Sequence, residues 1–354
     1  MKSSSKASKD ENKENESVKS NNIINNIKSR LILSKIYDNI PLKQKLGIVK
    51  YNKKIQNKLN LNIKDYKEYK ESFSSIIIEI ILCKNVYGRF IKINENEKLY
   101  YHIYFNDNKE EIKNKYEIKE DDKVTKIKII IDYQIKSFNF LFSKCECIES
   151  INFKQFYRNN IKTMSMMFYC CSSLKEINLS NFNTNNVTDM SWMFYGCSLL
   201  KELNLSNFNT NNVNNMCSMF YKCSSLKEIK FLNFCTNKVT DMNYMFYGCS
   251  SLKELNLSNF KTNNVIDMFK MFYGCSSLKD INISNFKYNK VINMKSMFYG
   301  CSNDLKVKIM YQIKNIREEA FLDDNVDNKS VSDDSYYDDI SGYSGYSDYS
   351  GYSD

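Results

Sequence analysis

Apolar residues return at a fixed interval of 26 residues through the second half of the chain. A cysteine, a phenylalanine three positions before it and two methionines recur in phase, with no insertion between residues 145 and 301. The cysteines in this register are Cys145, Cys171, Cys197, Cys223, Cys249, Cys275 and Cys301. A fixed period of roughly 20–50 residues is typical of stacked supersecondary units, because one unit alone cannot bury its apolar face.

Each repeat has two halves with different apolar periods. In SLKELNLSNF (251–260), Leu255 and Leu257 alternate with polar residues, which predicts a half-buried strand. In VTDMSWMFYGCS (187–198), apolar residues are spaced by three and four positions, which favours one face of a short helix. The sequence therefore predicts a stack of strand–turn–helix units with a continuous core.

The rest of the chain divides by composition and pattern. We expect 126–133 to form the strand that covers the first repeat and 304–313 to form the last strand. The segments expected in order are a disordered 1–22, a helical hairpin 23–72, a small mixed β region 73–125, the repeat solenoid with its caps 126–317, and a disordered acidic Ser/Gly/Tyr/Asp tail 318–354.

The residue types argue against catalytic and metal chemistry. The chain has 12 cysteines but a single histidine, His102, and no recurring Cys-x-x-Cys pair, so we expect no metal, no cofactor and no enzymatic activity. An odd column of seven cysteines cannot pair completely, which favours reduced thiols and a cytoplasmic location. We expect no secretory signal or lipid anchor, and the longest apolar run, 75–83, is too short to span a membrane.

Charge is divided unevenly along the chain. Residues 318–354 contain 11 acids and one lysine, a net charge of −10; because the whole chain carries +10, residues 1–317 carry +20. A basic helix with Lys50, Lys53 and Lys54 is the expected contact for the tail. Nucleic acid is a rival partner for this helix, but apart from Tyr51 it lacks interleaved aromatics, so nucleic-acid binding is not expected.

The alternate residues of each predicted strand point outward and form polar columns. They lie beside a lysine column that starts at Lys175, and the segment 226–232 departs from the consensus. One interpretation is a solvated, salt-bridged sheet face; the other is a recognition surface for a basic or hydrogen-bonding peptide. We call these outward residues the strip: Glu176, Asn178, Glu202, Asn204, Glu228, Lys230, Leu232, Glu254, Asn256, Asp280 and Asn282.

The unit LKELNLSNFNTNNVTDMSWMFYGCSS resembles the repeat of BspA-like leucine-rich repeat proteins over about residues 145–310. The resemblance implies an α/β repeat solenoid that is right-handed, with a parallel sheet on one face and short helices on the other. It implies an interaction scaffold that binds a protein partner, and we expect this scaffold to be monomeric. The alternatives are a surface-displayed adhesin of the BspA-like type and an F-box-like adaptor, since a helical hairpin precedes the repeats.

Overall fold

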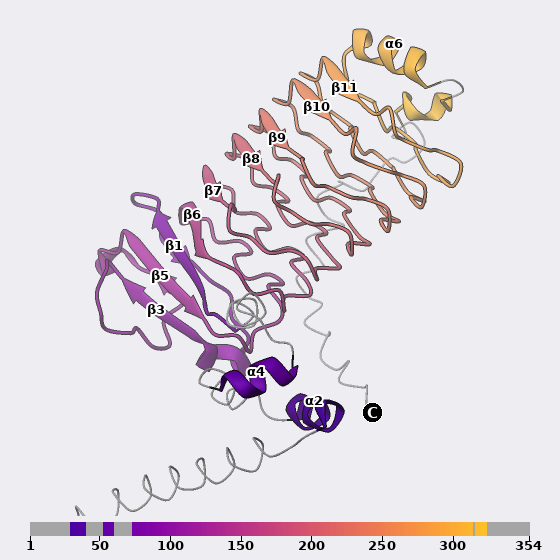
Figure 1. The fold of residues 1–354 in the computed structure, drawn as a ribbon. Coiled ribbons are helices and arrows are strands. Elements are labelled where there is room, and N and C mark those ends of the chain that lie inside the picture. Colours follow the sequence, from indigo (N-terminus) through magenta and orange to yellow (C-terminus); the bar gives the residue numbers. More distant parts are fainter. Residues whose placement is uncertain (1–28, 40–51, 60–72, 314–315, 324–354) are drawn as a thin grey trace, which may run out of the picture. The chain divides into compact units, whose positions relative to one another are not determined.

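The computed structural model describes residues 29–39, 52–59, 73–313 and 316–323 (Figure 1). The chain separates into two compact units, Met1–Phe73 and Ser74–Asp354, which are described one at a time. In the first unit, helices α2 (Arg30–Asn39) and α4 (Lys53–Leu59) bury Leu33 and Ile55. The expectations for residues 1–22 and for the tail from residue 324 onward lie outside the described residues.

The second unit begins with a five-stranded sheet in the order β3-β5-β1-β6-β7. Strand β1 pairs antiparallel with both β5 and β6, whereas β6 and β7 run parallel. The five strands are β1 (Ile76–Leu82), β3 (Tyr101–Phe105), β5 (Lys126–Ile131), β6 (Ile148–Gln155) and β7 (Glu176–Asn178).

The expectation that strand 126–133 covers the first repeat was wrong, because β1 lies between β5 and β6. Ile76, Ile78 and Ile80 are completely buried, so one face of β1 packs on the core, and β1 pairs with a strand on each edge. Short elements complete this region: β2 (Gly88–Arg89), β4 (Glu117–Ile118) and the 3₁₀ turns η1 (Glu95–Tyr100) and η2 (Glu120–Asp122).

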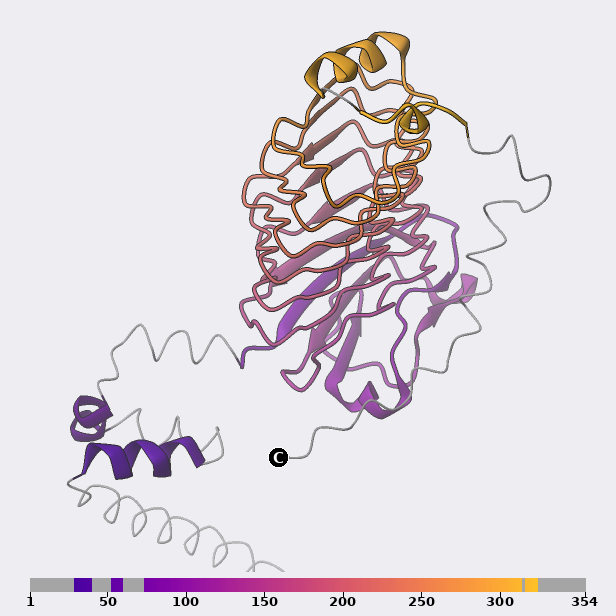
Figure 2. The same cartoon turned by 90° about the vertical axis from the view of Figure 1, so that its right-hand side faces the viewer.

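The repeats stack as successive coils, each with a short strand on one side (Figures 1 and 2). These strands pair in parallel as β6–β7, β8–β9 and β10–β11. On the opposite side, single parallel bridges join every coil from Ser137 to Asn293 without a break. The remaining repeat strands are β8 (Glu202–Asn204), β9 (Glu228–Lys230), β10 (Glu254–Asn256) and β11 (Asp280–Asn282).

Identical residues of successive coils form buried ladders, as the 26-residue period predicts. Rings of neighbouring phenylalanines stack at centroid distances of 5.2–5.8 Å, at Phe142, Phe168, Phe194, Phe220, Phe246, Phe272 and Phe298. The Cys223 thiol donates to the Phe194 carbonyl of the preceding coil at 3.1 Å, and the other repeat cysteines from Cys171 onward do the same. Each coil is thus tied to the next by packing and by hydrogen bonds.

Polar side chains also form hydrogen bonds from coil to coil. The Asn233 amide donates to the Ser206 carbonyl at 2.8 Å, and the Asn259 amide donates to the Leu232 carbonyl at 3.0 Å. The buried Thr210 hydroxyl donates to the Cys235 carbonyl and accepts from the Cys235 amide, both at 2.7 Å. Threonine at this position therefore satisfies two backbone groups where the strand pairing has ended.

The predicted short helices of the repeats are absent from the described residues, and this expectation was wrong. Residues 187–198 form consecutive turns whose amides donate to the next coil: Met190 to Asn215, Trp192 to Cys217 and Phe194 to Met219. Trp192 and Gly196 have left-handed φ values of 53° and 70°, which interrupt a right-handed helix. Apolar spacings of three and four positions therefore arise here from stacked turns.

The predicted last strand, 304–313, is instead helix α6 (Asn303–Gln312). The Ser302 hydroxyl accepts from the Leu305 amide and caps its start, and Leu305 and Ile309 turn inward while Val307 stays exposed. Together with η3 (Glu318–Ala320), α6 closes the stack. The Arg317 guanidinium donates to the carbonyls of Val291 and Ile292 of the last coil.

Candidate functional site

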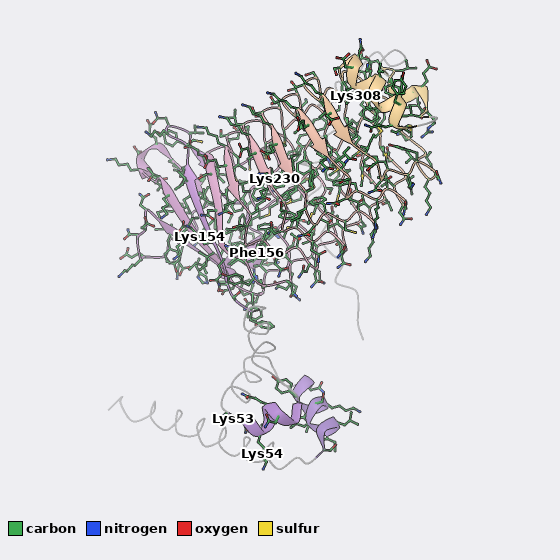
Figure 3. The ribbon with its side chains drawn as sticks, turned by 45° about the horizontal axis from the view of Figure 1, so that its top comes forward. Lys53, Lys54, Lys154, Phe156, Lys230 and Lys308 are labelled. Carbon is green, nitrogen blue, oxygen red and sulfur yellow. The ribbon has the colours of Figure 1, made fainter. Side chains whose placement is uncertain are left out.

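The strip lies on the strand side of the stack, and every residue in it is exposed. The central residue of each strand points the other way: Leu203, Leu255 and Ile281 are buried. Strand pleating produces this alternation, and parallel stacking aligns like side chains into columns about 4.8 Å apart. Figure 3 shows Lys230 beside the repeat strands in the middle of the stack and Lys308 on α6 at its end.

Most carboxylates of the strip have no cationic partner. Glu228 pairs with Lys230 of the same strand at 3.2 Å, but Glu176, Glu202, Glu254 and Asp280 form no ion pair within the described part of the chain. Lys175 reaches Glu149 of the preceding coil at 2.9 Å and so does not neutralise Glu176. Like charges about 5 Å apart repel by about 1 kcal/mol in water, and the neighbouring lysines Lys175, Lys201 and Lys230 offset this repulsion without pairing with Glu176 or Glu202.

The strip is hollowed over β7, β8 and β9. This hollow has a volume of about 430 Å³, and Ile177 and Leu203 contribute to its lining. Its polar lining residues are Lys175, Glu176, Lys201, Glu202, Asn204, Glu228 and Lys230. The predicted strip residues Glu176, Glu202, Asn204, Glu228 and Lys230 therefore converge on one concave surface, whereas Glu254 and Asn256 lie outside its lining.

The coil that departs from the consensus lies at the margin of this hollow. Leu232 stands where neighbouring coils have Ser206 and Ser258, and 68% of it is exposed. Phe231 takes the inward position and packs against Phe234 at a centroid distance of 4.7 Å. An exposed leucine next to a Lys–Glu pair gives this part of the strip a mixed apolar and charged character.

The basic helix of the first unit is only partly described. Lys53 and Lys54 are exposed on α4, next to the buried Ile55, while Lys50 lies outside the described residues. Figure 3 labels both described lysines. The contact between this helix and the acidic tail stays a prediction.

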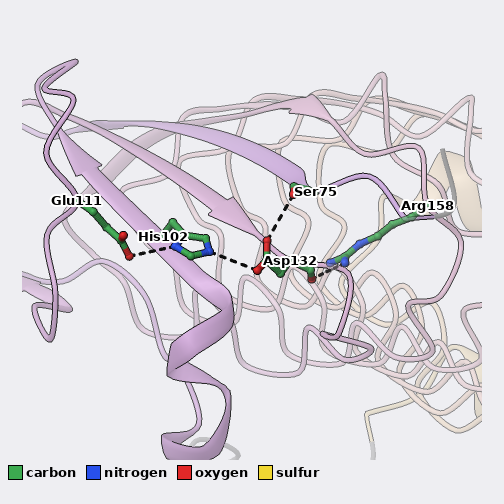
Figure 4. A network of polar contacts seen from close by, with 5 residues as sticks. All are labelled: Ser75, His102, Glu111, Asp132 and Arg158. Atoms are coloured by element: carbon green, nitrogen blue, oxygen red, sulfur yellow. Dashed lines mark hydrogen bonds and ion pairs between the residues drawn. The ribbon is translucent and has the colours of Figure 1, made fainter. Parts of the chain in front are cut away.

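A second polar cluster surrounds His102 on β3 (Figure 4). Its Nδ1 lies 3.0 Å from Glu111 Oε1 and its Nε2 lies 3.3 Å from Asp132 Oδ2. Burial lowers the pKa of His102, but hydrogen bonds to Glu111 and Asp132 outweigh it and raise the pKa above its ordinary value. Ser75 bonds to Asp132 rather than to His102, so the cluster lacks the nucleophile–base contact of a hydrolase triad.

The His102 cluster also has the wrong geometry for a metal. Its two carboxylates face opposite ring nitrogens and cannot converge on one ion. Among the residues that the structure describes, no group of three or more His, Cys, Asp or Glu side chains is arranged to hold a metal. The buried Arg158 donates to the Asp132 carbonyl, and burial lowers the pKa of its guanidinium to about 10. This arrangement ties β3, β5 and the start of the repeats together.

The fold and the strip define a repeat protein whose coils stack through short parallel strands and a buried phenylalanine ladder. A family model described as Mycoplasma protein of unknown function, DUF285, matches residues 136–234 and 227–322 in tandem. These matches cover more than half of the chain, which therefore belongs to the DUF285 family. No curated protein and no solved structure matches the chain. Over the described residues, no helix combines the length and apolar composition needed to cross a membrane.

Sequence reasoning found the strip but not its hollow. Lys175 and Lys201 belong to a lysine column that can be recognised in the sequence. Only the stacking of the coils places them in the lining of the hollow. Backbone pairing between strands is interrupted between β7 and β8 and between β9 and β10, and no local feature of the sequence indicates these interruptions. The hollow is therefore a property of how the coils are arranged.

Proposed function

We propose that this chain is a protein–protein interaction scaffold whose repeats form a right-handed leucine-rich-repeat-like solenoid of the BspA-like type. The observation that carries the proposal is the hollow over β7–β9, which is lined by the carboxylates of Glu176 and Glu202, while the coil of β9 also carries an exposed Leu232. Charged groups around a concave surface orient a partner of complementary charge and exclude partners that place like charges there.

The partner that this chemistry favours has a basic segment next to an apolar side chain. Lysine or arginine side chains would pair with Glu176 and Glu202, and Lys201 would restrict which registers are tolerated. Because the strip is a stack of rigid strands, binding would require little reorganisation of the scaffold.

A paired charge reversal tests the proposal. The variant Glu176→Lys/Glu202→Lys alters the hollow, and Glu110→Lys/Glu146→Lys makes the same charge change at exposed positions away from the strip. Proteins retained by immobilised wild-type chain are quantified against both variants, together with their melting temperatures. We expect the hollow variant alone to lose a specific partner, and equal retention by all three folded proteins would refute the strip as the binding surface.

A further inference from the structure

Two columns of opposite charge lie side by side along the strand side of the stack. The acidic column takes the first residue of each strand from β7 to β11, and the lysine column takes the residue before it in each coil. The acidic column is Glu176, Glu202, Glu228, Glu254 and Asp280, and the lysine column is Lys175, Lys201, Lys227, Lys253 and Lys279. All of these residues are exposed, so both columns are accessible to a partner.

The two columns do not pair with each other. Within the described part of the chain, Glu228 pairs with Lys230 and Lys175 pairs with Glu149, but no residue of one column forms an ion pair with a residue of the other. Neighbouring residues of an extended chain direct their side chains to different sides, which keeps each lysine apart from the carboxylate that follows it. A partner with the complementary pattern can therefore pair with both columns at once.

The dimensions of the two columns match an α-helix that lies along the stack. Strands β7 to β11 follow one another along the stack (Figure 1), and paired strands are about 4.8 Å apart. Helix residues at alternating spacings of three and four positions are about 5.3 Å apart, whereas alternate residues of an extended segment are about 6.7 Å apart. Over the two steps from β7 to β9, the mismatch is about 1 Å for the helix and about 4 Å for the extended segment. The three-residue strands are about 10 Å long, and a helix is about 10–12 Å wide.

We propose that the strip binds an α-helix of a partner protein, with a row of basic side chains over the acidic column and a row of acidic side chains over the lysine column. An apolar side chain between the two rows would enter the hollow, whose lining includes Ile177 and Leu203. A helix turned end for end would place like charges over each other, so the columns also fix the direction of the helix. The assignment rests on the proposed function, because the helix would belong to the partner that the strip receives.

The peptide KEAKLEAKEAKLEA is the probe for this site. In a helix its lysines and its glutamates form two rows on either side of the two leucines. The control peptide KEAKLEPKEPKLEA keeps every charge and both leucines, but its two interior prolines prevent a helix. Binding of each fluorescein-labelled peptide to the full chain is measured by anisotropy at low and high salt. We expect the helical peptide to bind at least about tenfold more tightly than the proline peptide, and to bind more weakly at high salt.

Two protein variants test the two columns separately. Glu202→Lys/Glu254→Lys reverses two charges of the acidic column, and Lys201→Glu/Lys253→Glu reverses two charges of the lysine column. Each variant should bind the helical peptide at least about fivefold more weakly, because two attractions become repulsions. The side chains of the peptide carry no net charge, so a change in the net charge of the protein alone should not alter its binding.

A matched control and three outcomes decide the proposal. Glu110→Lys/Glu146→Lys, at exposed positions away from the strip, should bind the helical peptide as the wild-type chain does. Equal binding of the two peptides, binding that neither column variant weakens, or no binding of the helical peptide at about 1 mM would overturn the helix. If Glu176→Lys/Glu202→Lys still loses a retained partner while the two peptides bind equally, the proposed function stands and only the helix is overturned.

Discussion

Replacement of Phe220 by alanine tests the phenylalanine ladder directly. The Phe220 ring is completely buried between the rings of Phe194 and Phe246, at centroid distances of 5.8 and 5.2 Å, and its edge meets Phe231 at 6.1 Å. Truncation of a buried phenylalanine costs about 3–5 kcal/mol. Each aromatic pair contributes about 0.5–1.5 kcal/mol beyond its buried area, so loss of two stacked neighbours places the expected cost in the upper half of that range.

Urea unfolding followed by circular dichroism and by the fluorescence of Trp192 measures this loss. Phe220→Leu is the matched control, because it keeps most of the volume and loses mainly the two aromatic pairs, so it should cost about 1–3 kcal/mol and less than Phe220→Ala. A lower midpoint with an unchanged slope indicates that the stack unfolds as one cooperative unit. A loss below about 1 kcal/mol for Phe220→Ala, or equal losses for the two variants, would refute the ladder as a main source of stability.

Three further predictions concern charge, backbone and thiols. Burial, and after it the charge of Asp267, raises the pKa of Asp241, so the ionised Asp241 carboxylate destabilises the folded state. Asp241→Asn should therefore raise the melting temperature at pH 7. The variant should lose this advantage below about pH 3.9, where the aspartate of the wild-type chain is already protonated. Lys222 has a left-handed φ of 52°, and the next coil has Gly248 at the equivalent position. Lys222→Gly should therefore raise the free energy of unfolding by about 0.5–1 kcal/mol in urea titrations, whereas the control Lys201→Gly should not. Burial raises the pKa of the Cys223 thiol to about 12, and the other cysteines of the 26-residue register are buried as well. A thiol reagent should therefore modify Cys83, Cys170 and Cys235 first, and all 12 cysteines only after denaturation. Rapid labelling of the buried repeat cysteines in the folded protein would contradict their burial.

The sequence by itself determined the period, the position of the repeat strands β7 to β11 and the membership of the buried columns. Phe220, Cys223 and Leu203 recur at intervals that no other arrangement explains as well, because equal spacing along the chain becomes vertical alignment once the coils stack. It also identified the outward columns of the strip, since alternation in a strand follows from its pleat.

Only the tertiary structure decided where the backbone hydrogen bonds go. Residues 187–198 have helix-like apolar spacing, but the carbonyls of the next coil accept their amides, and this option exists only after stacking. Likewise, Leu305, Val307 and Ile309 suit a strand, whereas Leu305 and Ile309 also suit one face of a helix. With no further coil to pair with, 303–312 satisfies its amides internally as α6.

Long-range pairing decided the remaining features. The insertion of β1 between β5 and β6 joins residues far apart in the chain, and no local pattern encodes such a partner. The hollow over β7–β9 follows from the pairing of whole strands, and helix α6 follows from where the stack stops. Local periodicity specifies which face of a strand is buried, but the neighbour along each edge is chosen by packing of the complete stack.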